Sequence, residues 1–115
     1  MMIDISVFSR FAFHDLPVSG ITITTEPYLA VTIGVCPFNE ARQDYDYYKL
    51  HFTEVDAFHL DEINFVTETD LEVYSSDYEV NDGEIAVTFT LLDALRQSAL
   101  LMITGKALRV EQYTP

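Results

Sequence analysis

The sequence of 115 residues is short of positive charge and of cysteine. Six lysines and arginines stand against nineteen aspartates and glutamates, which gives a formal net charge of −13 at pH 7. A surface of this sign repels a phosphate backbone, so we expect no binding to nucleic acid. The single cysteine, Cys36, has no partner for an internal disulfide, which indicates a reducing compartment.

Long apolar runs are missing as well. No stretch reaches the ~18 consecutive apolar residues of a transmembrane helix. Residues 1–13 include Asp4, where a secretory signal carries positive charge, and they lack a small-residue cleavage site. We therefore expect a cytoplasmic protein without a membrane span.

The longest uncharged run is Tyr28 to Cys36, YLAVTIGVC. It is rich in β-branched residues and follows Pro27, which favours a strand covered on both faces over a segment of buried helix. The hydrophobic fraction of 49% is that of a globular protein, and the length fits one domain spanning residues 1–115.

Alternating apolar residues and turn signals predict further strands. Gly20 to Cys36 is typical of a hairpin, Pro37 to Asp44 of an exposed loop, and Tyr45 to Glu54 of a strand. The pattern of residues 3–13 fits a strand or a helical turn, and that of residues 55–65 fits a strand or a short turn, so both segments stay open.

Asp82-Gly83 is the sharpest local signal, because this dipeptide favours a two-residue type I′ loop. Such a loop pairs Asn81 with Glu84. It then sets Val80, Tyr78, Ser76 and Tyr74 against Ile85, Val87, Phe89 and Leu91 on the core side. The remaining side chains, including Asp77, Glu79 and Glu84, point to solvent.

Towards the C-terminus, residues 99–104 and 107–113 are expected to pair around Gly105-Lys106 in a type II′ turn. The rival prediction is one helix near residues 91–103, where several leucines have helical spacing. With about eight strands expected, we predict a mainly β fold, an antiparallel sandwich or a partly open barrel. The helix would make the fold α+β instead.

The acidic residues are unevenly placed. Between Leu50 and Leu95 there are twelve of them and no lysine or arginine. Such a field speeds encounter with a basic protein, although acidic surfaces also serve solubility alone. Exposed tyrosines add rigid contact area. The predicted partner-binding residues are Tyr45, Tyr47, Asp77, Glu79 and Glu84.

Signals of catalysis are weak. His14, His51 and His59 lack the close spacing of metal ligands, and we expect them on the surface or in packing. Residues 77–88 do not match a calcium loop, because Gly83 comes one position late and Thr88 stands where a glutamate is needed. We expect no catalytic residue, no metal and no cofactor.

Phe13-His14-Asp15, Ile21, Ile23 and the strand from Leu29 to Val35 form a pattern that resembles small β-rich bacterial families. These families include immunity proteins of polymorphic toxin systems, and the resemblance covers about the first third of the chain. It implies an acidic protein that covers a basic toxin, with no catalytic residue to carry over.

Three functions follow from these observations. The first is a non-enzymatic binding module for a basic protein partner. The second is a small-molecule or metal-dependent enzyme that uses the three histidines and nearby carboxylates. The third is a structural or assembly subunit, whose exposed sheet edges pair in a homodimer.

Overall fold

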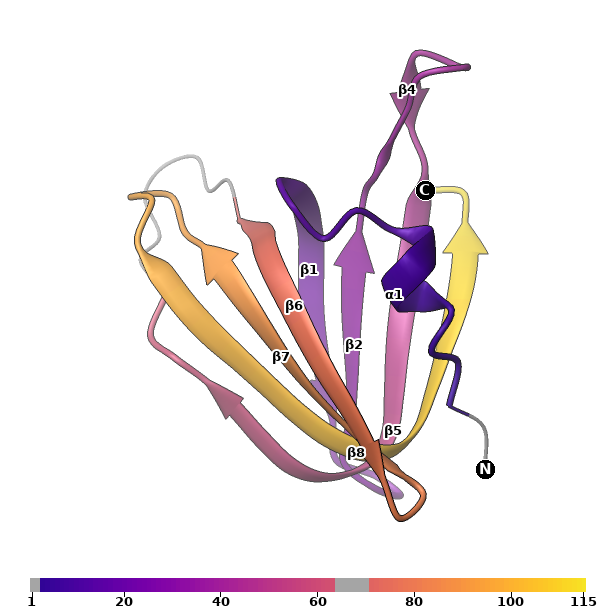
Figure 1. The fold of residues 1–115 in the computed structure, drawn as a ribbon, viewed down its shortest axis with the longest axis vertical. Coiled ribbons are helices and arrows are strands. Elements are labelled where there is room, and N and C mark those ends of the chain that lie inside the picture. The colour runs from indigo at the N-terminus through magenta and orange to yellow at the C-terminus, as the bar shows by residue number, and fades with distance from the viewer. Residues whose placement is uncertain (1–2, 64–70) are drawn as a thin grey trace.

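The computed structural model of the chain describes residues 3–63 and 71–115 and consists almost entirely of antiparallel strands (Figure 1). Six strands form a closed barrel in the order β1-β2-β5-β8-β7-β6, and β3 pairs separately with β4. The elements are α1 (Val7–Arg10), β1 (Leu16–Thr24), β2 (Ala30–Val35), β3 (Phe38–Asn39), β4 (Asp44–Tyr45), β5 (Tyr47–Leu60), β6 (Glu72–Asn81), β7 (Glu84–Leu92) and β8 (Ser98–Tyr113). The mainly β prediction is confirmed, and of the two architectures expected the chain adopts the barrel.

β1 and β2 form the first hairpin, as predicted for Gly20 to Cys36. Alternate residues of β2 point into the barrel, which buries Val31, Ile33 and Val35. The apolar run is therefore a strand, although Tyr28 lies before it and is 57% exposed.

β5 extends the strand expected at Tyr45 to Glu54 as far as Leu60, which resolves the described part of the open stretch 55–65 as mainly strand. Its residues Leu50 and Phe52 face the core. The expected loop at Pro37 to Asp44 forms most of the β3–β4 hairpin, which projects from the barrel at the top of Figure 1.

β8 is one continuous strand, so the predicted turn at Gly105-Lys106 is wrong. Residues 98–105 pair with β7 and residues 101–113 pair with β5, instead of with each other. Gly105 is buried beside a bulge in β5, and a Cβ atom there would lie 3.1 Å from the carbonyl oxygen of Thr53. The glycine permits a close approach of two strands and not a chain reversal.

The alternative of a helix near residues 91–103 is also wrong. A turn at residues 93–97 separates β7 from β8 in this range. Asp93 is buried in the turn, and its Oδ1 accepts hydrogen bonds from the N–H groups of Leu95, at 2.9 Å, and Gln97, at 3.0 Å. Burial then alternates along β8 as in a strand, with Ala99, Leu101 and Ile103 buried and Leu100 and Met102 exposed.

The N-terminal segment packs over the barrel interior. Residues 3–13, which the sequence left open, contain the single helical turn α1, whose Val7 is fully buried. Phe11 meets Tyr48 edge to face, with ring centroids 4.9 Å apart. Apart from this segment, the core consists mainly of Val31, Ile33, Val35, Leu50, Phe52, Ile85, Val87, Phe89, Leu91, Leu101, Ile103 and Leu108.

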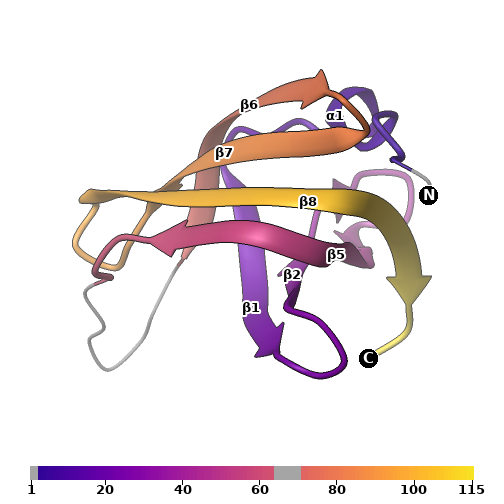
Figure 2. The same ribbon diagram turned by 90° about the horizontal axis from the view of Figure 1, so that it is seen from below.

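The barrel closes through a short seam. β1 pairs with β6 only at Leu16 with Val73 and at Pro17 with Glu72. Beyond the seam the two strands separate, and Figure 2 shows the far end of β6 well away from β1. In the described part of the chain, no helix has the length and apolar character needed to cross a membrane.

Candidate protein-binding surface

The hairpin of β6 and β7 ends in the turn predicted for it. Asp82 and Gly83 have φ angles of 50° and 76°, as a type I′ loop requires. The register agrees with the prediction back to Ser75. A bulge at Tyr74 then shifts the pairing by one residue, so that Val73 and not Tyr74 lies opposite Leu91.

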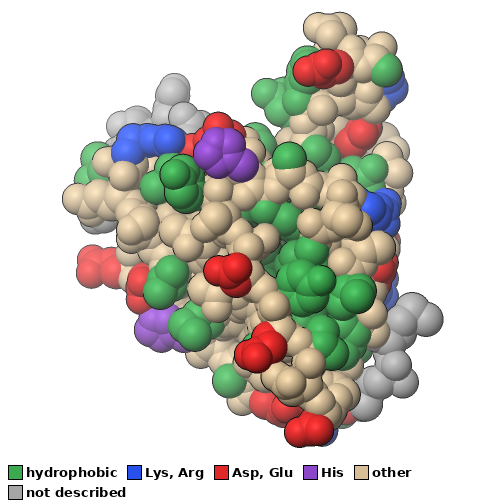
Figure 3. All heavy atoms as spheres, viewed as in Figure 1, with side chains coloured by type: hydrophobic (Ala, Val, Ile, Leu, Met, Phe, Trp, Pro, Cys, Tyr) green, Lys and Arg blue, Asp and Glu red, His purple; other side chains and the backbone are tan. Residues whose placement is uncertain are grey.

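Three predicted contact residues share the outer face of this hairpin. Asp77 lies opposite Thr88 and Glu79 opposite Ala86, and both carboxylates are exposed, whereas Glu84 is half-buried. Within the described residues, neither Asp77 nor Glu79 forms an ion pair. Figure 3 shows acidic side chains spaced along β6 towards the tip of the hairpin. The negative charge of this face is therefore uncompensated.

A shallow depression of about 450 Å³ lies on the same outer face. Its floor comes from β7 and β8, and Met102 there is 44% exposed. The lining residues are Asp77, Tyr78, Glu79, Ala86, Thr88 and Met102. The apolar side chains of Ala86 and Met102 beside the carboxylates suit a lysine or arginine, because its stem packs on apolar surface while its charged end reaches an acid.

The inner face of β6 differs from the prediction. Tyr74, Tyr78 and Val80 were expected in the core, but they are 47%, 45% and 45% exposed. The reason is the short seam: β1 pairs with β6 only at its first two residues, so no strand of the described residues covers the rest of this face. Phe8 stacks on Tyr78 with ring centroids 4.2 Å apart. One signal was present in the sequence, because Ser76 and Tyr78 are more polar than Phe89 and Val87, the residues they face on β7.

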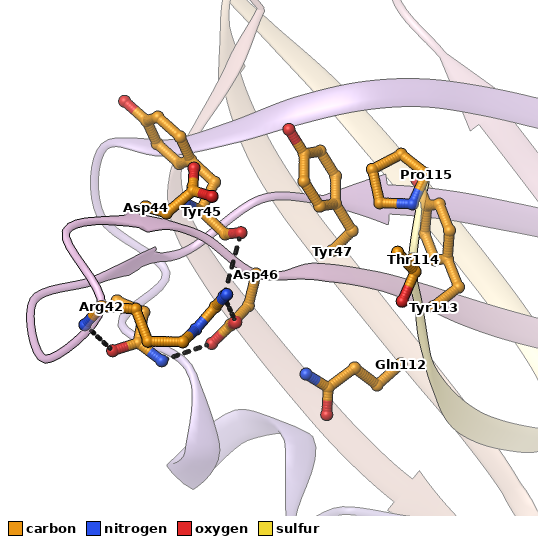
Figure 4. A pocket seen from close by; sticks show the side chains of 10 residues that line it. Arg42, Asp44, Tyr45, Asp46, Tyr47, Gln112, Tyr113, Thr114 and Pro115 are labelled. Atoms are coloured by element: carbon orange, nitrogen blue, oxygen red, sulfur yellow. Dashed lines mark hydrogen bonds and ion pairs between the residues drawn. The ribbon is translucent and has the colours of Figure 1, made fainter.

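The two remaining predicted residues, Tyr45 and Tyr47, line a separate cleft of about 490 Å³ between the β3–β4 hairpin and the end of β8 (Figure 4). Arg42 crosses this region, where it forms an ion pair with Asp46 and bonds to the carbonyl of Tyr45. The ring of Tyr47 lies 5.9 Å from that of Tyr113.

The predicted residues thus form two groups. The cleft with Tyr45 and Tyr47 lies by the hairpin at the top of Figure 1, and the Asp82-Gly83 turn lies at the bottom. Only Asp77, Glu79 and Glu84 come together on one surface. The exposed tyrosines beside these acids are Tyr74 and Tyr78, which the sequence analysis had assigned to the core.

The three histidines do not converge, because each has its own partners. His14 lies beside Asp15 at 3.3 Å, His51 bonds to Thr32 and Glu111, and His59 bonds to Asp61. Across residues 3–63 and 71–115, no group of three or more histidine, cysteine, aspartate or glutamate side chains could hold a metal ion. Cys36 is buried, as a small apolar residue at the end of a strand would be.

Two of these histidine contacts lower the pKa of a carboxylate. His51 Nε2 lies 2.8 Å from Glu111 Oε1, and this hydrogen bond is the main cause of a lowered pKa for Glu111. The pKa of Asp61 is also lowered, first by the N–H of Leu100 and second by His59. Both carboxylates are exposed and already partnered, which is typical of surface contacts and not of a general acid.

Comparison with protein-family models, with curated proteins and with solved structures finds no match for this chain.

Proposed function

We propose that the protein is a non-enzymatic binding module that holds a basic protein through the hairpin of β6 and β7. The observation that carries the proposal is the pair of exposed carboxylates, Asp77 and Glu79, on one face without a compensating cation. The net charge of −13 adds a long-range field of the same sign. Such a field raises the rate of encounter with a positively charged partner.

Exposed aromatic residues can supply binding energy that the charges alone do not supply. Carboxylates at the rim of an interface govern rate and specificity more than affinity, whereas tyrosines often carry the binding energy. Tyr74 and Tyr78 lie on the same strand as Asp77 and Glu79, and both are almost half exposed. The hairpin therefore combines an acidic face with an aromatic one.

An immunity-type role belongs to this proposal. Such a protein is acidic and covers a basic toxin, which agrees with the charge and with the resemblance in residues 13–35. We place the interaction in the cytoplasm, since the one cysteine is buried and unpaired.

The test is capture of partners from a lysate of the protein's own cells, at low and at high salt. We expect a basic protein whose recovery falls as salt rises, because screening weakens attraction between exposed charges. The variant D77N/E79Q should weaken binding about two- to thirtyfold, since each of two exposed ion pairs contributes about 0.2–1 kcal/mol.

A matched control removes the same charge elsewhere. Glu26 and Glu40 are exposed and lie on other turns, so E26Q/E40Q should bind as the wild type does. Equal recovery at both salt concentrations, or capture of no basic protein, would contradict the proposal.

A further inference from the structure

One edge of β6 pairs with β7 along the hairpin, whereas within residues 3–63 and 71–115 the other edge pairs with a strand only at Glu72 and Val73 and is otherwise free. In a two-residue hairpin the residues flanking the turn exchange two hydrogen bonds, and bonded and non-bonded pairs alternate from there. Asn81 flanks the turn, so Asn81, Glu79 and Asp77 bond to β7. The residues between them direct their N–H and C=O groups to the free edge; these are Ser76, Tyr78 and Val80.

A contact at the start of the free edge agrees with this direction of the backbone groups. Nδ1 of His14 lies 3.3 Å from the carbonyl oxygen of Tyr74, which therefore points away from β7. Ser76, Tyr78 and Val80 follow with the same orientation. Among the described residues, no backbone group bonds to these three on the free side.

The two faces beside the free edge differ in chemistry. Asp77 and Glu79 lie on the outer face, uncompensated. Tyr78 and Val80 lie on the inner face, where Phe8 stacks on Tyr78. Because side chains alternate along a strand, a segment laid beside β6 would meet acids on one face and apolar groups on the other.

We infer that an extended basic segment of the partner protein adds to the free edge of β6 as a further strand. The edge hydrogen bonds of Ser76, Tyr78 and Val80 give affinity, as in other cases of strand addition. Asp77 and Glu79 select lysine or arginine at alternate positions, and Tyr78 with Phe8 selects apolar residues between them. This inference rests on the proposed function and specifies how the same surface binds.

A second copy of this chain is a poorer occupant. Pairing of two β6 edges would place Asp77 and Glu79 against acidic residues of the other copy, and like charges across a strand pair are destabilising. Acidic residues on an edge strand protect against self-association in this way. The homodimer predicted from the sequence is therefore not expected through this edge.

The test uses the full chain, labelled with ¹⁵N, and a short synthetic peptide that alternates lysine and valine. Binding should shift the amide signals of Ser76, Tyr78 and Val80 and slow their hydrogen exchange. Proline is tolerated where the N–H of an edge strand faces outward, so Ser76→Pro should keep the fold and weaken binding at least about tenfold. A peptide that alternates glutamate and valine is the charge control and should not bind.

A second probe keeps the test decisive if Ser76→Pro does not fold. The lysine–valine peptide with N-methyl groups on the amides that would face β6 retains its charge but cannot donate to the edge. It should bind the wild type at least about tenfold more weakly. Equal binding of the two peptides, or signal shifts confined to another surface, would overturn strand addition.

The two proposals can fail separately. A basic partner captured from the lysate, with no binding of the lysine–valine peptide at β6, would refute the strand mechanism and leave the proposed function standing. Binding of the peptide at β6 with no basic partner in the lysate would refute the proposed function alone.

Discussion

Asp61 and Leu100 exchange two hydrogen bonds at the end of the β5–β8 pairing. The Asp61 N–H donates to the Leu100 carbonyl at 3.0 Å, and the Leu100 N–H donates to Asp61 Oδ2 at 2.9 Å. His59 Nε2 lies 2.6 Å from Oδ1 of the same carboxylate. These contacts favour the charged form, so the pKa of Asp61 is lowered, with the Leu100 N–H as the largest cause.

His59→Ala should raise the pKa of Asp61 only part of the way. The Leu100 N–H remains in place and keeps the pKa below the usual aspartate value, which carbon-detected NMR titration can follow. Because the folded pKa lies below the unfolded one, this contact stabilises the fold above the usual aspartate pKa. Its contribution is lost as pH falls through the folded value. A return of Asp61 to an ordinary pKa in His59→Ala would show that His59 is the main cause.

Asp93→Ala should destabilise the protein by about 1–3 kcal/mol. Its carboxylate is buried and accepts the N–H groups of Leu95 and Gln97, and both donors would lose this acceptor. Asp93→Asn is the matched control, because it keeps an acceptor oxygen and should cost less. Urea unfolding of the three proteins measures the difference, and equal stability of Asp93→Ala and wild type would contradict it.

Gly105→Ala should also destabilise the fold, whereas Gly20→Ala should not. The added methyl group at Gly105 would meet the Thr53 carbonyl at 3.1 Å, and backbone in a paired strand cannot move without cost. Crowding of this kind costs about 1–3 kcal/mol. At Gly20 nothing lies within 4 Å of the added atom, so reduced freedom of the unfolded chain should stabilise by about 0.4–1 kcal/mol. Thermal unfolding should therefore move in opposite directions for the two variants.

Local signals in the sequence were sufficient where the structure depends on neighbours along the chain. Asp82-Gly83 sets the turn and the register back to Ser75, because both residues must adopt positive φ. The turn predicted at Gly105-Lys106 was wrong because the structure there depends on a residue distant in sequence. A glycine that permits a turn and one that permits close approach of another strand look alike until the distant residue, here Thr53, is known.

The exposure of Tyr74 and Tyr78 depends on contacts distant in sequence, and the polarity of their strand gave only a partial signal of it. Alternation correctly placed Tyr78 on the inner side of β6, whereas the bulge at Tyr74 moves that residue out of the predicted register. Whether the inner side is covered depends on how far β1 pairs with β6. The seam ends at Leu16 and Pro17, about sixty residues away in sequence. The acidic outer face, in contrast, follows from the hairpin register alone, and Asp77 and Glu79 lie where the pattern predicted.

The variant D77N/E79Q should make the free protein more stable while it weakens partner binding. Asp77 and Glu79 are alternate residues of one strand, their side chains lie on one face, and no cation of the described chain neutralises them. Removing such repulsion should raise the free energy of unfolding by about 0.2–1 kcal/mol at low salt, and by less at high salt. The control E26Q/E40Q makes the net charge less negative by the same amount but removes two carboxylates that lie on different turns and not on one strand face, so its gain should be smaller. Binding surfaces often keep residues that lower the stability of the fold because those residues recognise a partner, and repulsion between Asp77 and Glu79 would be such a case. If D77N/E79Q is no more stable than E26Q/E40Q at low salt, the two carboxylates do not repel each other, and the charge argument for this surface fails.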